Sequence, residues 1–172
     1  MKKSFLFLSF VLLAFSFACK KDSNKEETTE LTIRMTDAPF NATEVNVEIL
    51  QVRAKFTDDD GPDGWYDLNT RAGIYNLLTL QNGIDTALAQ GIVPLRTLKE
   101  IRFVLGNRNS ILINNVLYPL TIPSGSESGL KIKLDKKLNA RFDFLLLDFD
   151  AQMSIIQTGN GEYKLKPVIK IK

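Results

Sequence analysis

The stretch VNVEILQVRAKF, residues 45–56, decides the fold. In its first half the apolar residues occupy odd-numbered positions: Val45, Val47 and Ile49. In its second half they occupy even-numbered positions: Leu50, Val52, Ala54 and Phe56. An apolar residue at every second position predicts a β-strand with one buried face. The change of parity predicts a β-bulge near Ile49-Leu50, where one strand carries an extra residue.

The same alternation recurs along the chain. It is found in the ranges 31–36, 101–105, 116–122, 130–135 and 163–171. Short strands with one solvent-exposed face, separated by Gly, Asn and Pro turns, predict an all-β fold. We expect an antiparallel β-sandwich formed by residues 31–172 as a single domain. Asn114-Asn115 and the stretch TGNGEY at 158–163 predict hairpins, since Asn and Gly tolerate the positive φ of tight turns.

One short helix is expected near 81–90. Leu80, Ile84 and Leu88 recur at helical spacing there, and Gly91 follows as a stop signal.

A second informative stretch is LLLDFDAQMSI, residues 145–155, which predicts a buried strand containing two carboxylates. On a strand, Asp148 and Asp150 point to one face while Leu147 and Phe149 point to the other. Carboxylates inside an apolar run are costly unless they are paired, hydrogen-bonded or bound to a cation. The stretch therefore predicts a structural ion pair, a metal site or an acid/base pair.

The residue types that are missing exclude several kinds of chemistry. The chain has no His and only one Cys. The absence of His excludes Ser-His-Asp and Cys-His catalysis. One Cys forms no internal disulfide and no cysteine cluster for zinc or iron–sulfur. Chemistry in this chain is left to carboxylates, Lys, Arg, Ser, Thr and Tyr.

The N-terminus predicts export and lipidation. Lys2 and Lys3 precede an apolar run that ends in Ala18-Cys19 and is too short to span a membrane. A signal peptide ending in Ala-Cys resembles the bacterial lipoprotein signal. The resemblance implies that residues 1–18 are removed and that Cys19 carries the lipid. The other interpretation is an ordinary signal peptide with a chance Cys, which would leave a free thiol in an exported protein.

Residues 19–30 are interpreted as the lipidated Cys followed by a polar tether, since KKDSNKEETTE has no apolar residue to bury. The segment also resembles the region after the lipid Cys in Bacteroidota lipoproteins, where a Lys followed by acidic residues can direct the protein to the outer face, and the resemblance implies an outer-membrane protein exposed there. A generic charged linker is the alternative. The full sequence has 22 basic and 20 acidic residues, and removal of Lys2 and Lys3 with the signal peptide leaves 20 of each. The mature chain would therefore have no surplus of basic residues to favour nucleic acid as a partner.

Six blocks of sequence carry a family resemblance. They are MTDAPF (35–40), GW (64–65), LLTLQNG (77–83), IRFVLG (101–106), YPLTIPSGSESGLK (118–131) and LDFDAQMSIIQTGNGEYKLKPVIKI (147–171). Together, in this order, they resemble the domain-of-unknown-function family 4382, which occurs often on lipoproteins. The resemblance implies a transthyretin-like or immunoglobulin-like β-sandwich and no established activity.

The polar residues of these blocks form a candidate structural or cation-binding cluster. Its members are Asp37, Arg102, Ser124, Ser128, Lys131, Asp148 and Asp150. In the structural hypothesis Arg102 or Lys131 pairs with Asp148 or Asp150, and Asp37 bonds backbone amides of its own turn. In the cation hypothesis, the Asp carboxylates and the carbonyls of PSGSESG supply oxygen ligands for calcium. No other cofactor is expected.

Two further hypotheses remain open. As an enzyme, the chain would be a carboxylate-dependent hydrolase using two Asp residues as acid and base, or would use Lys131 with Ser128 as a nucleophile. As a binding module, it would use Trp65 and Tyr66 as a platform for sugar or peptide. The alternative for Trp65 is a rim aromatic that closes the sandwich.

The combined expectation is a lipid-anchored envelope protein without catalytic activity that binds a glycan or an envelope protein. A calcium-stabilised carbohydrate-binding module is the principal alternative.

Overall fold

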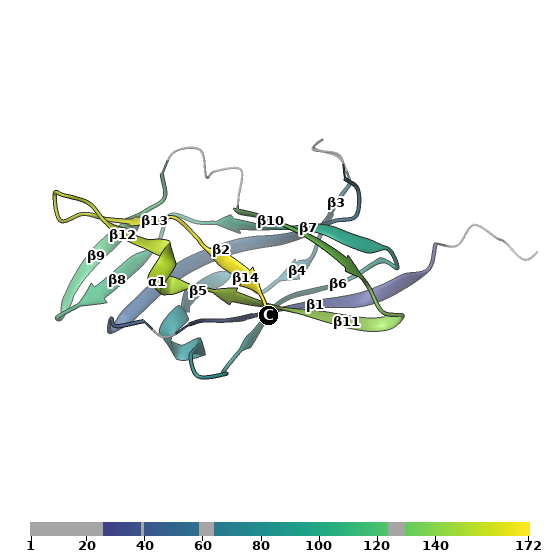
Figure 1. Ribbon diagram of the computed structural model, residues 1–172, viewed down its shortest axis with the longest axis horizontal. Coiled ribbons are helices and arrows are strands. Elements are labelled where there is room, and N and C mark those ends of the chain that lie inside the picture. The colour runs from purple at the N-terminus through teal and green to yellow at the C-terminus, as the bar shows by residue number, and fades with distance from the viewer. Residues whose placement is uncertain (1–25, 39, 59–63, 124–129) are drawn as a thin grey trace, which may run out of the picture.

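The structure is a computed structural model that describes residues 26–38, 40–58, 64–123 and 130–172. Two β-sheets pack face to face around one hydrophobic core (Figure 1). The five-stranded sheet has the order β14 (Ile169–Ile171), β11 (Arg141–Phe149), β1 (Thr28–Thr36), β6 (Thr86–Pro94) and β4 (Asn69–Thr70). The predicted β-sandwich is therefore confirmed.

The nine-stranded sheet contains the remaining strands. Its main path is β10 (Leu130–Lys137), β7 (Thr97–Leu105), β2 (Glu44–Lys55), β8 (Ser110–Ile113), β9 (Val116–Thr121), β13 (Tyr163–Leu165) and β12 (Ile155–Gln157). Two further strands, β3 (Trp65–Asp67) and β5 (Gly73–Asn76), pair with β2. Strand β2 is thus the organising strand of this sheet, with four neighbours along its length.

The expectation of a wholly antiparallel sandwich is wrong, because both sheets are mixed. Strand β11 runs parallel to β1 from Thr29 opposite Arg141 to Thr36 opposite Asp148, and β13 runs parallel to β9. The chain changes sheets between β10 and β11, which returns it to β1 without a hairpin. Alternation of apolar residues identifies a strand with one buried face, but it carries no information on the direction of its neighbours.

The predicted bulge and hairpins are present. The register between β2 and β7 shifts between Ile49 and Gln51, and Leu50 is the extra residue, with an exposed side chain. Asn114 and Asn115 have φ of 49° and 62° and join β8 to β9 as a two-residue hairpin. Residues 158–162 join β12 to β13.

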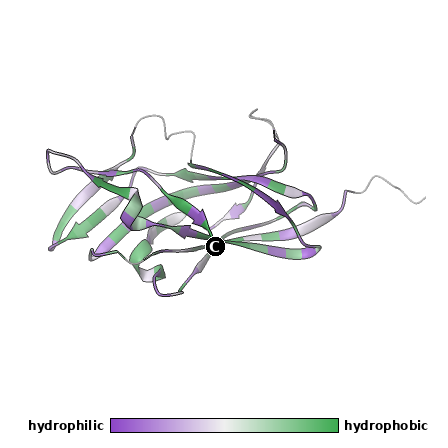
Figure 2. Cartoon of the chain, viewed as in Figure 1, coloured by the Kyte–Doolittle hydropathy of each residue, from purple (hydrophilic) through white to green (hydrophobic). Residues whose placement is uncertain are grey.

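Alternate side chains fill the space between the sheets, and Figure 2 shows the matching alternation of hydrophobic and hydrophilic residues along the strands. Phe103 of β7 and Phe149 of β11 are fully buried. Each buried Phe contributes about 1.5–3 kcal/mol to the free energy of folding. The core therefore accounts for the association of two sheets that share no strand.

The helix expected near 81–90 is a second wrong prediction. Asn82 and Gly83 form a turn with φ of 59° and 83°, and β6 begins at Thr86. A short apolar run does not distinguish helix from strand by spacing alone, and pairing with β1 decides the outcome here. The helical segments lie elsewhere: the 3₁₀ helix η1 (Leu77–Leu80) and the helix α1 (Ala151–Ser154).

The strand expected over 145–155 ends earlier, at Phe149. Asp150 begins α1 instead of continuing the strand. The C-terminal run 163–171, expected as one alternating segment, is divided between β13 of the nine-stranded sheet and β14 of the five-stranded sheet.

The sandwich begins before the expected domain boundary at residue 31. Strand β1 starts at Thr28, and Glu27 O accepts a hydrogen bond from Leu95 N at 2.8 Å. Polar residues join a strand here because backbone pairing needs no apolar side chain. Cys19 and the signal segment 1–18 lie outside the described residues. Within the described ranges, the chain has no helix long and apolar enough to cross a membrane.

Candidate functional site

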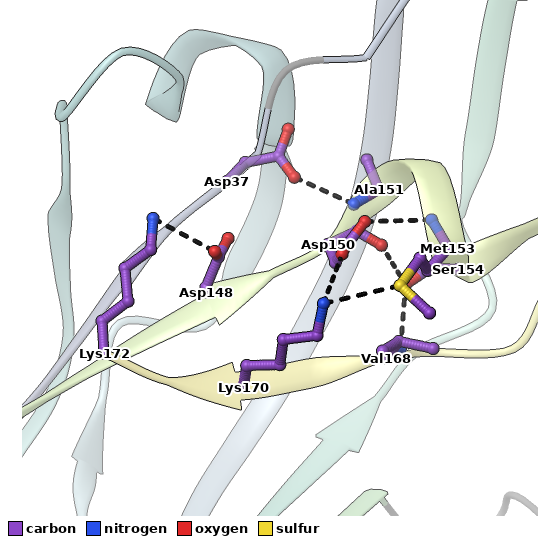
Figure 3. Close-up of polar contacts among 9 residues, drawn as sticks. All are labelled: Asp37, Asp148, Asp150, Ala151, Met153, Ser154, Val168, Lys170 and Lys172. Atoms are coloured by element: carbon purple, nitrogen blue, oxygen red, sulfur yellow. Dashed lines mark hydrogen bonds and ion pairs between the residues drawn. The ribbon is translucent and has the colours of Figure 1, made fainter.

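Three buried aspartates gather where β11 ends and β14 pairs with it (Figure 3). We call Asp37, Asp148 and Asp150, together with Lys170 and Lys172, the acidic cluster. The three carboxylates are nearly inaccessible, with 2%, 8% and 7% of their residue surfaces exposed.

Asp150 is the N-cap of α1. Its Oδ1 accepts a hydrogen bond from Met153 N at 3.0 Å, and its Oδ2 accepts one from Lys170 Nζ at 3.0 Å. Burial alone would raise the pKa of Asp150, but these two donors outweigh burial and hold the pKa below its usual value. The backbone of Asp150 also bonds Val168 and Ser154, so this residue ties α1 to the C-terminal segment.

Asp37 lies after the end of β1 and reaches across to α1. Its Oδ1 accepts a hydrogen bond from Ala151 N at 2.9 Å, and its Oδ2 accepts a weaker one from Gln81 Nε2 at 3.3 Å. Burial raises the pKa of Asp37 from 3.8 to about 6, although the bond from Ala151 N opposes the rise. The backbone amide of Ala38, in the turn of Asp37 itself, also opposes the rise in pKa, as the sequence predicts, and the amide of Ala151, 114 residues away, is an additional donor.

Asp148 is the least compensated member of the acidic cluster. Its Oδ2 lies 3.1 Å from Lys172 Nζ, and the Lys172 side chain is half exposed. Its Oδ1 is buried and has no hydrogen-bond partner. Asp148 and Asp150 therefore pair with different lysines, Lys172 directly after β14 and Lys170 within it, and both pairs hold β14 against β11 at the edge of the five-stranded sheet.

The basic partners expected for this cluster lie elsewhere. Arg102 is on β7 in the other sheet and Lys131 is on β10 beside it, so the expected pairs with Asp148 or Asp150 do not form. The missed partners, Lys170 and Lys172, were visible in the sequence as basic residues two apart. Their pairing with two carboxylates depends on the register of β14 with β11, which the sequence pattern does not specify.

The cation hypothesis finds no support in this arrangement. No group of three or more acidic residues suited to a metal ion occurs in the part of the chain that the structure describes. Ser124 and Ser128, with most of the PSGSESG carbonyls, lie outside the described residues. The hypothesis of a Lys131–Ser128 nucleophile depends on Ser128 and therefore also lies outside the described residues.

A second polar region lies on the outer face of the nine-stranded sheet. Val52 and Ala54 of β2 are fully buried in the core, so Arg53 and Lys55 point to the outer face. Register places two rows of residues across β10, β7, β2 and β3: Lys131, Arg102, Arg53 and Asp67 in one, and Lys133, Glu100, Lys55 and Trp65 in the other. We call these eight residues the Trp65 face.

Trp65 lies at the centre of the basic residues of this face. The Arg102 guanidinium carbon is 4.1 Å from the centroid of its ring, and Arg53 and Lys55 are 5.7 Å and 5.6 Å away. These distances are those of cation–π contacts. Trp65 is half-buried on a short edge strand, while the side chain of Lys55 beside it is almost fully buried.

The Trp65 face contains buried polar atoms without partners. Trp65 Nε1, Glu100 Oε1 and Arg102 Nε are buried and have no hydrogen bond. Glu100 itself is 6% exposed, and its Oε1 is 4.0 Å from Arg102 Nη2, which is too far for a hydrogen bond. Three of the four such atoms identified among the described residues therefore belong to this one face, and the fourth is Asp148 Oδ1.

Tyr66 does not share this platform. It lies opposite Ala54, whose side chain faces the core, and its ring packs edge-on against Phe56 at 5.4 Å. Consecutive residues of a strand point to opposite faces, so Trp65 and Tyr66 are separated by the sheet. Tyr66 is a rim aromatic of the core.

An open cleft of about 620 Å³ lies farther along the same outer face. Its lining includes the bulged Leu50, Leu105 and Ile122, with Glu48 at its polar side. The guanidinium of Arg108 lowers the pKa of Glu48 and holds its carboxylate. A Cβ at Gly106 would lie 2.0 Å from Glu48 Oε2, so a larger residue there would displace the Glu48 side chain. The parity change that predicts the bulge is the only sequence signal of this cleft.

Comparison with known proteins identifies a family for most of the chain. Residues 28–167 match the family described as a domain of unknown function (DUF4382). No curated protein and no solved structure matches the chain.

Proposed function

The chain belongs to the DUF4382 family, and from that premise we propose that it is a non-catalytic binding module of the cell envelope. In this proposal a lipid on Cys19 holds the protein to the outer membrane, and the Trp65 face binds a glycan or an envelope protein. The family description assigns no activity, so the argument depends on the described residues.

The observation that carries the proposal is the concentration of unpartnered polar atoms on the Trp65 face. A buried polar atom without a hydrogen bond costs about 1–3 kcal/mol. Folded proteins rarely keep such atoms, and retain them chiefly where function requires them. At the Trp65 face, Glu100, Arg102 and Trp65 each contribute one, next to a half-buried aromatic ring of the kind that ligands contact.

The acidic cluster supports a structural role by the same reasoning. Asp150 and Asp37 have their oxygens occupied by backbone amides, a lysine and Gln81. A carboxylate used as an acid, a base or a metal ligand must keep an oxygen available to substrate or ion. In this proposal Asp37 and Asp150 serve the fold, and binding is assigned to the other sheet, where Arg102 and Lys131 lie.

The binding part of the proposal is tested by the fluorescence of Trp65, the sole Trp of the chain. The full-length chain is titrated with envelope polysaccharide and with envelope protein fractions. We expect one fraction to change the emission saturably, and the change to be lost in Arg102→Gln but kept in Arg71→Gln, an exposed Arg outside the Trp65 face. No saturable change with either fraction would contradict the proposal.

The anchoring part is tested separately. Replacing Cys19 with Ser removes the proposed lipid site, and we expect the protein to move from the membrane fraction to the soluble fraction of the cells. A variant that remains in the membrane fraction as the wild type does would contradict lipidation at Cys19. Protease added to intact cells then reports whether the domain is exposed on the outer face.

A further inference from the structure

We propose that the ligand of the Trp65 face is an acidic carbohydrate, with a uronate unit placed against Trp65, Glu100 and Arg102. This inference depends on the proposed binding function and names the chemical class of the ligand. It is drawn from the charge of the face and from which of its atoms lack partners.

The charge of the Trp65 face favours an anionic ligand. The two cross-strand rows contain five basic side chains and two acidic ones. Arg53 is paired with Asp67, and Lys55 and Lys133 have interactions of their own, so Arg102 and Lys131 are the basic side chains that we assign to the ligand. The side chain of Lys131 is exposed beside Arg102. Two basic side chains next to one carboxylate, Glu100, favour an anionic ligand over a cationic one.

The unpartnered atoms specify more than a negative charge. Trp65 Nε1 and Arg102 Nε are donors, whereas Glu100 Oε1 is an acceptor. A ligand carboxylate only accepts, so it satisfies the two donors and leaves Glu100 unpaired and repelled. A hydroxyl group donates, so it satisfies Glu100. A uronate unit carries a carboxylate and neighbouring hydroxyls on one ring, so it offers both the acceptor and the donors that these atoms lack.

Access to these atoms requires Trp65 to move. All three atoms are buried, and the indole ring lies against the Arg102 guanidinium. Trp65 begins a strand of three residues and follows Gly64, whose φ of 77° suits a turn. We therefore expect the ligand to displace the indole ring from Arg102 and to take its place, which changes the environment of the sole Trp.

The test titrates the full-length chain with three probes of equal length while Trp65 emission is recorded. The probes are oligogalacturonate, its fully methyl-esterified and therefore neutral form, and an oligoglutamate peptide. We expect a saturable emission change with oligogalacturonate and at least tenfold weaker binding of each of the other two. The ester tests the carboxylate, and the peptide tests the hydroxyls.

Variants assign the effect to residues. Arg102→Gln should weaken oligogalacturonate binding at least tenfold, and Arg71→Gln, the matched control, should leave it unchanged. Glu100→Gln should narrow the preference for oligogalacturonate over the peptide to less than threefold, because the repulsion of a second carboxylate is removed. Should Arg102→Gln fail to fold, Lys131→Gln, an exposed change on the edge strand β10, should weaken binding severalfold.

Each other outcome overturns part of the inference. Equal binding of the ester would show that the carboxylate is not recognised. Equal binding of the peptide would identify a general acidic-peptide surface instead. No binding of any probe, while an envelope fraction still changes Trp65 emission, would reject the uronate and leave the binding function intact. If neither the probes nor the envelope fractions change Trp65 emission, both the uronate ligand and the binding function are rejected.

Discussion

The two polar regions of the molecule differ in how far their buried polar atoms are hydrogen-bonded. In the acidic cluster, Asp150 accepts from a backbone amide and a lysine, Asp37 accepts from the amide of Ala151, and Asp148 keeps one buried oxygen without a hydrogen bond. On the Trp65 face, Trp65, Glu100 and Arg102 each keep one such atom. Burial of a charged side chain is common to both regions, so the share of buried polar atoms without hydrogen bonds is the property by which we compare them.

The largest expected effect is the loss of the Asp150 carboxylate. Asp150→Ala removes the N-cap of α1 and the partner of Lys170 together, so we expect a loss of about 3 kcal/mol in the free energy of unfolding. Urea denaturation measures it. A loss below about 0.5 kcal/mol would remove the distinction between the two regions by showing that the acidic cluster is not structural.

The pH dependence of stability separates Asp37 from Asp150. Because the folded state raises the pKa of Asp37 from 3.8 to about 6, the folded carboxyl binds its proton more tightly than the unfolded one. Stability contributed by Asp37 is therefore fully present below pH 3.8 and is lost as pH rises through 6, by about 3 kcal/mol in total, of which about 2 kcal/mol is lost between pH 4.5 and pH 7. Asp150 has the opposite sign: its lowered pKa gives stability that is lost as pH falls below 3.8.

Urea denaturation between pH 3 and pH 8 should accordingly show greater stability near pH 4.5 than at pH 7. Asp37→Asn should abolish the decrease between pH 4.5 and pH 7, since the amide keeps an acceptor for Ala151 N and does not ionise. A wild-type protein whose stability rises steadily from pH 4.5 to pH 7 would contradict the assignment.

A smaller effect is expected at Asp148. Its Lys172 partner is half exposed, and its Oδ1 has no hydrogen bond to lose. Asp148→Asn should cost less than about 1 kcal/mol, as exposed ion pairs do. The sequence alone favours a large effect for both carboxylates. A loss equal to that of Asp150→Ala would show that the two aspartates act as one unit.

The smallest expected effect is that of chelation. Because each carboxylate of the acidic cluster already has an amide or a lysine as a partner, and Asp148 Oδ1 alone has no hydrogen bond, EDTA should leave the melting temperature within about 1 °C of the untreated protein. A fall of several degrees, reversed by added calcium, would restore the cation hypothesis and make the acidic cluster a ligand site.

Local backbone features such as bulges and hairpins could be predicted from the sequence, while the pairing and register of strands distant in the sequence could not. The parity change at Ile49-Leu50 locates a bulge because it is a property of one strand, and Asn114-Asn115 locates a hairpin for the same reason. The partners of Asp148 and Arg102 depend on which strands pair and in which register. The alternation of apolar residues specifies neither the neighbouring strand nor the register. At Gln81–Gln90, pairing with β1 overrides helical spacing.

The candidate site follows the same division. Trp65 was recognisable as a candidate, but its separation from Tyr66 follows from alternation only once β3 is known to be a strand. The unpartnered atoms of Glu100 and Arg102 are not visible in the sequence, since they arise from the cross-strand rows that join β10, β7, β2 and β3.

The most direct test of the account compares two identical chemical changes, Asp150→Asn and Glu100→Gln, each of which turns a buried carboxylate into an amide of the same shape. Urea denaturation at pH 7 gives both free energies of unfolding. The account predicts that Asp150→Asn loses about 1 kcal/mol, because the lysine loses its charged partner, and that Glu100→Gln is as stable as the wild type or more stable. A Glu100→Gln variant that loses as much stability as Asp150→Asn would contradict the account, since Glu100 would then serve the fold and not a ligand.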